Sequence, residues 1–137
     1  MNMDHLPKDK RSWNMSQIRS KDTSVEKQVR SFLFKKGLRY SLHNKKLPGK
    51  PDIYFKKYNA VIFINGCFWH RHKNCKRCTT PKTNKKYWLD KFINNTTRDK
   101  ENYKKLKKLG FRVYIIWECQ VTNEKRLESL YNKIIDV

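Results

Sequence analysis

Cysteine and histidine are concentrated in one part of this 137-residue chain. Residues 66–84 hold three of the four cysteines and two of the four histidines, and Cys119 follows a later apolar run. The first residues show no apolar run of the kind found in export signals, and in that setting such clusters more often bind metal than form disulfides. Zinc takes four nitrogen or sulfur ligands. Ligation by Cys67, His72, Cys75 and Cys119 would join this segment to the end of a distant strand as a closed structural site.

The choice of ligands within this segment stays open. Cys75 and Cys78 have the spacing of a zinc hairpin, so Cys78 competes for a place in the site. His70 is an alternative to His72 as the nitrogen ligand. A set of free thiols beside two loop histidines is the remaining interpretation.

Helix and strand patterns alternate around the Cys/His segment. Thr23 and Glu26 have the spacing of a capping box, and the apolar positions that follow predict a helix ending at Gly37. A short strand is expected over residues 38–43 and a turn over residues 47–51. The later elements are expected to be two strands, a long helix, a buried strand and a last helix, over residues 52–55, 60–65, 85–109, 111–117 and 123–134. This order predicts one α/β sandwich domain with a central mixed β-sheet flanked by helices.

The charge of the chain indicates the class of its partner. Lysine and arginine number 33 against 12 acidic residues, for a net charge of +21. Such a field favours nucleic acid as the partner, although a lysine-rich composition set by codon usage would give the same count. The basic residues are spread from Lys8 to Lys133, and no apolar run approaches the roughly 20 residues that span a bilayer. We therefore expect a cytoplasmic protein with no membrane partner.

Asp52 is an informative carboxylate in so basic a chain. It follows Pro51 at the head of a predicted strand. Cleavage of a phosphodiester needs a divalent cation, and Mg²⁺ takes oxygen ligands such as a carboxylate and a backbone carbonyl from a neighbouring strand. His70, if it does not bind zinc, is a candidate general base or acid. The alternatives are that Asp52 only forms a turn and that Glu26 only completes the capping box.

Aromatic residues stand where a DNA-binding protein would use them. Phe68 and Trp69 lie inside the Cys/His segment, where a metal-pinned loop would make them wedges between bases. Trp88 opens the long predicted helix, where core packing against Phe92 is an equal alternative.

Five stretches of this chain closely resemble the very short patch repair (Vsr) DNA mismatch endonucleases. Their sequences are SQIRSKDTSVE, LPGKPD, VIFINGCFWH, YW with the later RD pair, and GFRVYIIWEC, at residues 16–26, 47–52, 61–70, 87–99 and 110–119. The resemblance implies a restriction-endonuclease-like fold over residues 21–137, with a zinc-stapled loop at 66–84. It also implies nicking of one DNA strand beside a T:G mismatch, the product of 5-methylcytosine deamination, with Mg²⁺ for the chemistry and one structural Zn²⁺.

The resemblance also implies a role for each matching residue. Asp52 and the main-chain carbonyl of Ile64 match the Mg²⁺ ligands. His70 matches the histidine proposed to activate the attacking water, and Glu26 the acidic residue that supports it. The matching zinc ligands are Cys67, His72, Cys75 and Cys119, which leaves Cys78 spare. The matching DNA wedge consists of Phe68, Trp69 and Trp88, with Met15 on an N-terminal DNA-contacting arm over residues 1–20.

The chain departs from the family pattern at two positions. Asn65 stands where some members carry a catalytically important histidine; asparagine can hydrogen-bond phosphate or a metal-bound water but cannot shuttle protons. Ile64 replaces a threonine of some members, which matters little if only its carbonyl is used.

The expected substrate is double-stranded DNA with a T:G mismatch. We expect a monomer with a functional link to a DNA cytosine methyltransferase and to mismatch-repair proteins. Two alternatives stay open: a related DNA nuclease without mismatch preference, and a zinc-stapled DNA-binding module without hydrolysis.

Overall fold

A computed structural model describes residues 23–136 of the chain. The arm expected over residues 1–20, with Met15, lies outside these residues. The described helices and strands, including two short 3-10 turns labelled η, are α2 (Ser24–Lys35), β1 (Ser41–Leu42), β2 (Ile53–Phe55), η1 (Lys56–Tyr58), β3 (Ala60–Asn65), α3 (Lys85–Lys108), β4 (Arg112–Trp117), η2 (Glu118–Gln120) and α4 (Glu124–Ile135). No helix in this described part is both long and apolar enough to cross a bilayer.

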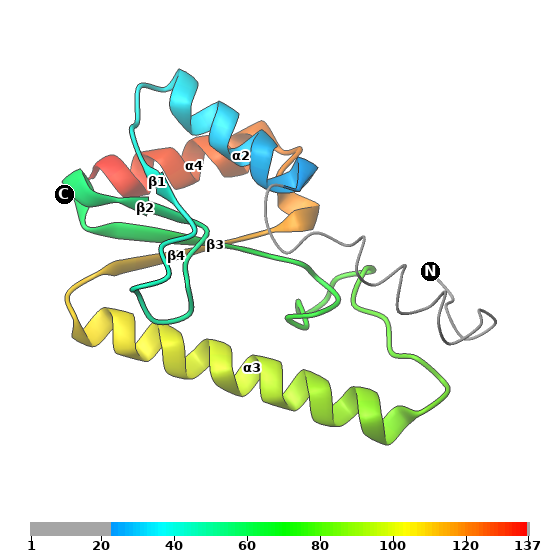
Figure 1. The fold of residues 1–137 in the computed structure, drawn as a ribbon. Helices are drawn as coiled ribbons and strands as arrows, with labels where there is room; N and C mark the ends of the chain where they lie inside the picture. The colour runs from blue at the N-terminus through cyan, green and yellow to red at the C-terminus, as the bar shows by residue number, and fades with distance from the viewer. Residues whose placement is uncertain (1–22, 137) are drawn as a thin grey trace.

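The four strands form one mixed sheet in the order β1-β2-β3-β4. β1, β2 and β3 are antiparallel neighbours, whereas β3 and β4 run parallel. A parallel pair needs a long crossover connection, which residues 66–84 and α3 provide here. Figure 1 shows α2 and α4 on one face of the sheet and α3 on the other. The predicted α/β sandwich around a mixed sheet is therefore confirmed.

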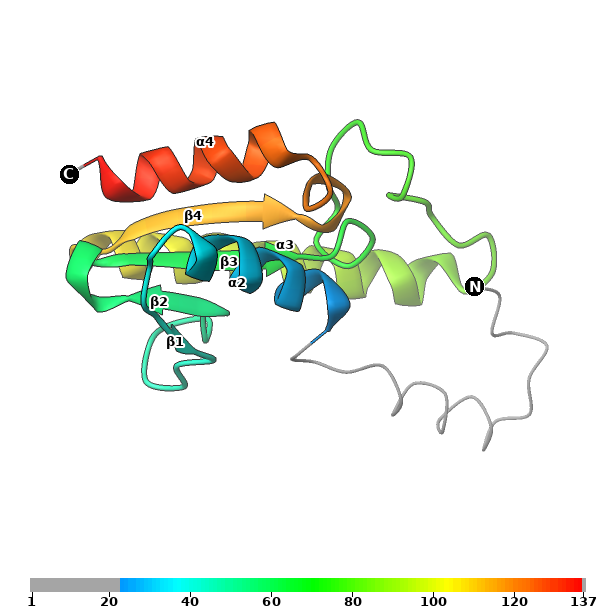
Figure 2. The same ribbon diagram turned by 90° about the horizontal axis from the view of Figure 1, so that it is seen from above.

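Side-chain alternation along β3 divides the core between the two faces. Ile62 packs into the larger cluster, which includes Leu33 of α2 and Leu130 of α4. Val61 and Phe63 point to the opposite face and pack against Leu106 of α3. Figure 2 shows α2 and α4 running beside each other over the sheet, where Lys36 and Glu128 form an ion pair. β3 is thus the central element, and side chains at its carboxyl end reach both layers.

Two expected strands differ from those observed. The strand predicted over residues 38–43 shortens to β1, and both of its residues are exposed. The strand predicted as buried over residues 111–117 begins at Arg112, and only Ile116 within it is buried. In the described sheet β4 pairs with β3 alone and lies at the edge. An edge strand with one neighbour keeps more of its surface in water, so the prediction of a buried strand is wrong.

The long helix keeps its predicted length but not a continuous apolar contact with the core. Phe92 and Leu106 are buried, whereas Leu89 and Ile93 are 47% and 59% exposed. In Figure 1 the first half of α3 extends past the end of the sheet. Phe68 and Trp69 of the loop that precedes α3 pack there on Trp88 and Phe92, so the beginning of α3 helps to hold the loop.

Candidate active site and metal cluster

The start of β2 lies against the end of β3. Their antiparallel register pairs Ile53 with Ile62, which places Asp52 beside the last residues of β3. The Ile64 backbone N–H donates to Asp52 Oδ2 over 2.7 Å. Burial raises the pKa of Asp52 to about 6; the nearby negative charge of Glu26 acts in the same direction, while the Ile64 hydrogen bond opposes it. Because burial disfavours the ionised form, a bound cation would stabilise this carboxylate, and the exposed part of the side chain leaves room for a cation to reach it.

Glu26 joins this carboxylate through His43. The Thr23 hydroxyl accepts the Glu26 backbone N–H over 3.2 Å, which is the backbone half of the predicted cap. The Glu26 carboxylate is buried, and its Oε2 lies 3.4 Å from His43 Nε2. The other ring nitrogen, Nδ1, lies 4.0 Å from Asp52 Oδ1. The three residues therefore form a group that could hold a metal ion.

His43 has no place among the sequence-predicted site residues. Its position comes from the pairing of β1 with β2: its backbone N–H donates to the Asp52 carbonyl over 3.1 Å, one residue beyond the paired strands. The sequence offered one signal, a histidine at the end of a predicted strand. Only the register reveals that it faces Asp52.

His70 lies in the loop after β3 and pairs with a carboxylate of α3. Its Nδ1 is 2.5 Å from Asp99 Oδ2. The His70 backbone N–H donates to the Gly66 carbonyl over 3.1 Å, which fixes the turn that carries the ring. If Asp99 is ionised, this pair would hold the imidazole proton on Nδ1 and leave the lone pair on Nε2, which is the form that a general base needs. Asp99 is the second residue that sequence reasoning did not place in the site.

Asn65 ends β3 on the α3 side of the sheet. Its side chain is buried, and its Nδ2 donates to the Tyr103 hydroxyl over 2.9 Å. Burial raises the pKa of Tyr103 to about 12, and the charges of Asp99 and Asp52 add to that rise. Asn65 thus shares this end of the sheet with Asp52 and His70.

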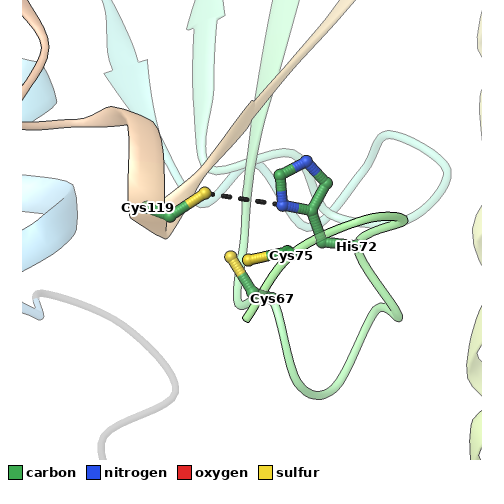
Figure 3. A group of neighbouring side chains, drawn as sticks. All are labelled: Cys67, His72, Cys75 and Cys119. Atoms are coloured by element: carbon green, nitrogen blue, oxygen red, sulfur yellow. Dashed lines mark hydrogen bonds between the residues drawn. The ribbon is translucent and has the colours of Figure 1, made fainter. Parts of the chain in front are cut away.

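The four sequence-predicted zinc ligands come together (Figure 3). One ligand atom from each of Cys67, His72, Cys75 and Cys119 lies within 4.8 Å of the others, and Cys119 Sγ is 3.4 Å from His72 Nδ1. Cys67 follows β3 and Cys119 lies in η2 after β4, so the parallel strands bring the two sulfurs to one edge. Three sulfurs and one imidazole nitrogen are a donor set that suits zinc.

The surroundings of this cluster orient its members. The His72 ring stacks on Trp117 with centroids 4.3 Å apart. Glu118 Oε1 accepts the Cys67 backbone N–H over 3.0 Å. Burial raises the pKa of Cys67 to about 12, whereas a backbone hydrogen bond from Arg77 lowers the pKa of Cys75. A bound cation would favour the thiolate at Cys67, which burial alone disfavours.

The two rival ligands fall outside this group. His70 pairs with Asp99, and Cys78 closes a turn by donating its backbone N–H to the Cys75 carbonyl over 3.0 Å. Neither residue belongs to the four-membered cluster.

The aromatic residues of the loop pack onto the beginning of α3. The Phe68 ring centroid lies 5.0 Å from Trp69, 5.9 Å from Trp88 and 5.2 Å from Phe92. Phe92 is buried, while the other three are half-buried. Arg71 braces the loop: its guanidinium lies 3.9 Å from the Phe92 ring centroid and donates to the Thr79 carbonyl over 2.8 Å. Trp88 therefore both packs in a cluster and keeps part of its surface open.

Comparison with known proteins agrees with this architecture. Residues 3–77 match the family of the DNA mismatch endonuclease Vsr. The chain is 43% identical over 126 residues to the type II nicking enzyme V.NmeAIP of Neisseria meningitidis, covering 92% of this chain and 89% of that protein. It is 41% identical over 133 residues to the type II nicking enzyme V.XorIIP of Xanthomonas oryzae, covering 97% of each. It is 40% identical over 117 residues to the DNA mismatch endonuclease Vsr of Escherichia coli, covering 85% and 74%. On this evidence the chain belongs to the Vsr family of DNA mismatch endonucleases.

Proposed function

We propose that this protein is a Mg²⁺-dependent DNA endonuclease that nicks one strand of a duplex beside a T:G mismatch. One observation carries the proposal: a half-buried carboxylate and a histidine–carboxylate pair both lie near the carboxyl end of β3. They are Asp52, bonded to the backbone of Ile64, and His70, bonded to Asp99. Family membership supports the choice of DNA as the substrate.

The oxygens at this end of the sheet fit a magnesium ion. Mg²⁺ is usually held by one or two carboxylates with waters and phosphate. The Asp52 carboxylate and the main-chain carbonyl of Ile64 would supply protein ligands, with Glu26 close behind. Such an ion would neutralise charge on the phosphate and lower the pKa of a bound water.

The residues around the cation divide the remaining work. His70 accepts a proton from the attacking water at Nε2, while Asp99 holds Nδ1 protonated and orients the ring. Glu26 supports the site through His43 and Asp52. Asn65 cannot shuttle protons, so it acts by hydrogen bonding alone.

The second metal in this proposal is a structural zinc. Its ligands are Cys67, His72, Cys75 and Cys119, whose donor atoms already lie together. A closed four-ligand site leaves no position for substrate, so its effect is on folding. It would hold residues 66–84, and with them His70, against the ends of β3 and β4.

In this proposal, basic charge and aromatic side chains bind the DNA. The net charge of +21 supplies affinity that depends on salt but not on sequence. Phe68, Trp69 and Trp88 stay partly open and would stack beside the mismatched pair, with help from Met15 of the arm. We further propose that the protein acts as a monomer linked in function to a cytosine methyltransferase and to mismatch repair, because T:G pairs arise where 5-methylcytosine deaminates.

The test uses two duplexes that differ only in one T:G or C:G pair, each strand carrying its own label. With Mg²⁺ and zinc-loaded protein, we expect one strand of the T:G duplex to be nicked and the C:G duplex to stay intact. Asp52→Asn should remove nicking and retain binding, whereas Asp90→Asn, an exposed carboxylate of α3, should change neither. Equal cutting of both duplexes would favour a nuclease without mismatch preference. Tight binding with no cutting would favour a DNA-binding module.

A further inference from the structure

The hydrogen bond between Asn65 and Tyr103 has a direction that matters for the substrate. Asn65 Nδ2 is the donor and the Tyr103 oxygen the acceptor, 2.9 Å apart. A phenol hydroxyl also carries one proton of its own to donate. Within residues 23–136, Asn65 is the one hydrogen-bond partner of that hydroxyl. The proton of Tyr103 is therefore left for a group that is not part of the described chain.

The two side chains are held rigidly in this arrangement. Asn65 is 4% exposed and lies on the same face of β3 as Phe63. The Phe63 and Tyr103 rings pack edge to face, with centroids 4.9 Å apart. Tyr103 is half-buried. The apolar cluster holds its ring in place, while part of the side chain remains exposed to solvent.

The hydroxyl lies beside the groups of the proposed nuclease site. Tyr103 follows Asp99 by four residues on α3, which places both side chains on one face of the helix, one turn apart. Asn65 directly follows Ile64, whose N–H binds Asp52. The carboxylates of Asp52 and Asp99 are near enough to raise the pKa of Tyr103, which burial already raises to about 12. The phenol therefore stays neutral and adds no negative charge to repel a phosphate.

We propose that Tyr103 donates its hydroxyl proton to a non-bridging oxygen of the phosphodiester that is cut, and that Asn65 is the positioning residue that holds the hydroxyl. The proposal rests on the proposed function and names a further contact in the same site. Hydrogen bonds to a charged acceptor are stronger than those between neutral groups. A donor fixed in advance also needs no reorganisation when charge develops on the phosphate.

The first test compares two tyrosines that line the same apolar cluster. Tyr103→Phe and Tyr54→Phe each remove one hydroxyl from the α3 side of the sheet, and Tyr54 is remote from Asn65 along the strands. We expect Tyr103→Phe to lower the single-turnover nicking rate by about 10- to 100-fold. Tyr54→Phe should nick at the wild-type rate. Equal rates for all three proteins would overturn the proposal.

The second test reads the contact through binding and needs no cleavage. A set of T:G duplexes carries one uncharged methylphosphonate, moved phosphate by phosphate past the mismatch, and affinity is measured by anisotropy without divalent cation. At one position, the methylphosphonate should lower the affinity of the wild type by about tenfold or more, and it should lower the affinity of Tyr103→Phe much less. Asn65→Leu should behave as Tyr103→Phe does, and the double variant should add nothing further. An identical methylphosphonate profile for wild type and Tyr103→Phe would show that the Asn65–Tyr103 bond only satisfies a buried amide.

The two tests separate this inference from the function it rests on. A wild type that nicks no duplex but shows the Tyr103-dependent methylphosphonate effect would end the nuclease proposal and retain the phosphate contact. A wild type that nicks T:G duplexes while Tyr103→Phe matches it in both tests would retain the nuclease and end the contact.

Discussion

The Nδ1 atom of His70 lies 2.5 Å from Oδ2 of Asp99, although the two residues are 29 positions apart in the chain. The histidine belongs to the loop after β3 and the aspartate to the middle of α3. The packing of Phe68 on Phe92 holds these two segments together, while the Cys/His cluster ties the loop to η2 after β4. The tautomer of the proposed general base thus depends on how the loop is fixed to the helix.

Asp99→Asn tests this dependence. An amide keeps the shape of the carboxylate but can donate to Nδ1, which would move the imidazole proton to Nε2 and remove the base. We expect the single-turnover nicking rate to fall by about 10²- to 10⁴-fold with little change in DNA affinity. Asp90→Asn on the same helix is the matched control. A rate for Asp99→Asn equal to that of the control would remove Asp99 from the mechanism.

The raised pKa of Asp52 predicts a cost to the metal-free fold that depends on pH. The pKa is about 6 when folded against an ordinary value of 3.8, so the folded state favours the protonated acid. The contribution of Asp52 to the free energy of unfolding is therefore at its full value below about pH 4, and it is lost as the pH rises through 6. Without divalent cations, Asp52→Asn should therefore raise the free energy of unfolding at pH 8, by at most about 3 kcal/mol, and leave it unchanged at pH 4.

Urea denaturation at the two pH values measures this effect, with Asp90→Asn as the control. Added Mg²⁺ should stabilise the wild type and not Asp52→Asn, because a ligand that binds only the folded state stabilises it. A gain in stability of the same size at both pH values would mean that the substitution acts through packing and not through the charge.

Local sequence patterns predicted the helices and strands of this fold well, but they did not predict which distant residues would contact one another. Thr23 caps α2 as its spacing indicates, because a cap depends on residues within one turn. The contacts of His43 depend on how β1 pairs with β2, and those of Asp99 on how a long loop packs on a helix. Arg112 donates to the carbonyls of Tyr58 and Ile134, which are far apart in the chain. No local spacing encodes such a contact, since it exists only when the sheet and α4 are assembled.

The Cys/His cluster could be predicted because its residue types are rare in the chain, and a pair of serine variants tests which of these residues bind zinc. Cys119→Ser removes a member of the cluster, whereas Cys78→Ser removes the one cysteine outside it. We expect Cys119→Ser to lose bound zinc and to melt at a lower temperature, while Cys78→Ser keeps both properties of the wild type. Elemental analysis and thermal unfolding give the two readouts. Loss of zinc from Cys78→Ser would show that residue to be a ligand.

The partly open aromatic cluster predicts how mismatched and matched duplexes are distinguished. Trp69 is supported by Phe68 and Trp88, whose ring centroids are 5.0 and 5.8 Å away, and it is only half-buried, so part of its ring remains accessible. Stacking on a base is worth about 1–3 kcal/mol, and a mismatched pair is cheaper to unstack than a matched one. Trp69→Ala should therefore weaken T:G binding by about tenfold or more and C:G binding much less, as measured by anisotropy at fixed salt. Phe34→Ala removes an aromatic side chain that is 52% exposed on α2, away from the loop, and should change neither affinity. An equal loss of affinity for both duplexes would mean that Trp69 only stabilises the loop, because a side chain that stacks at the mismatch should affect the T:G duplex more.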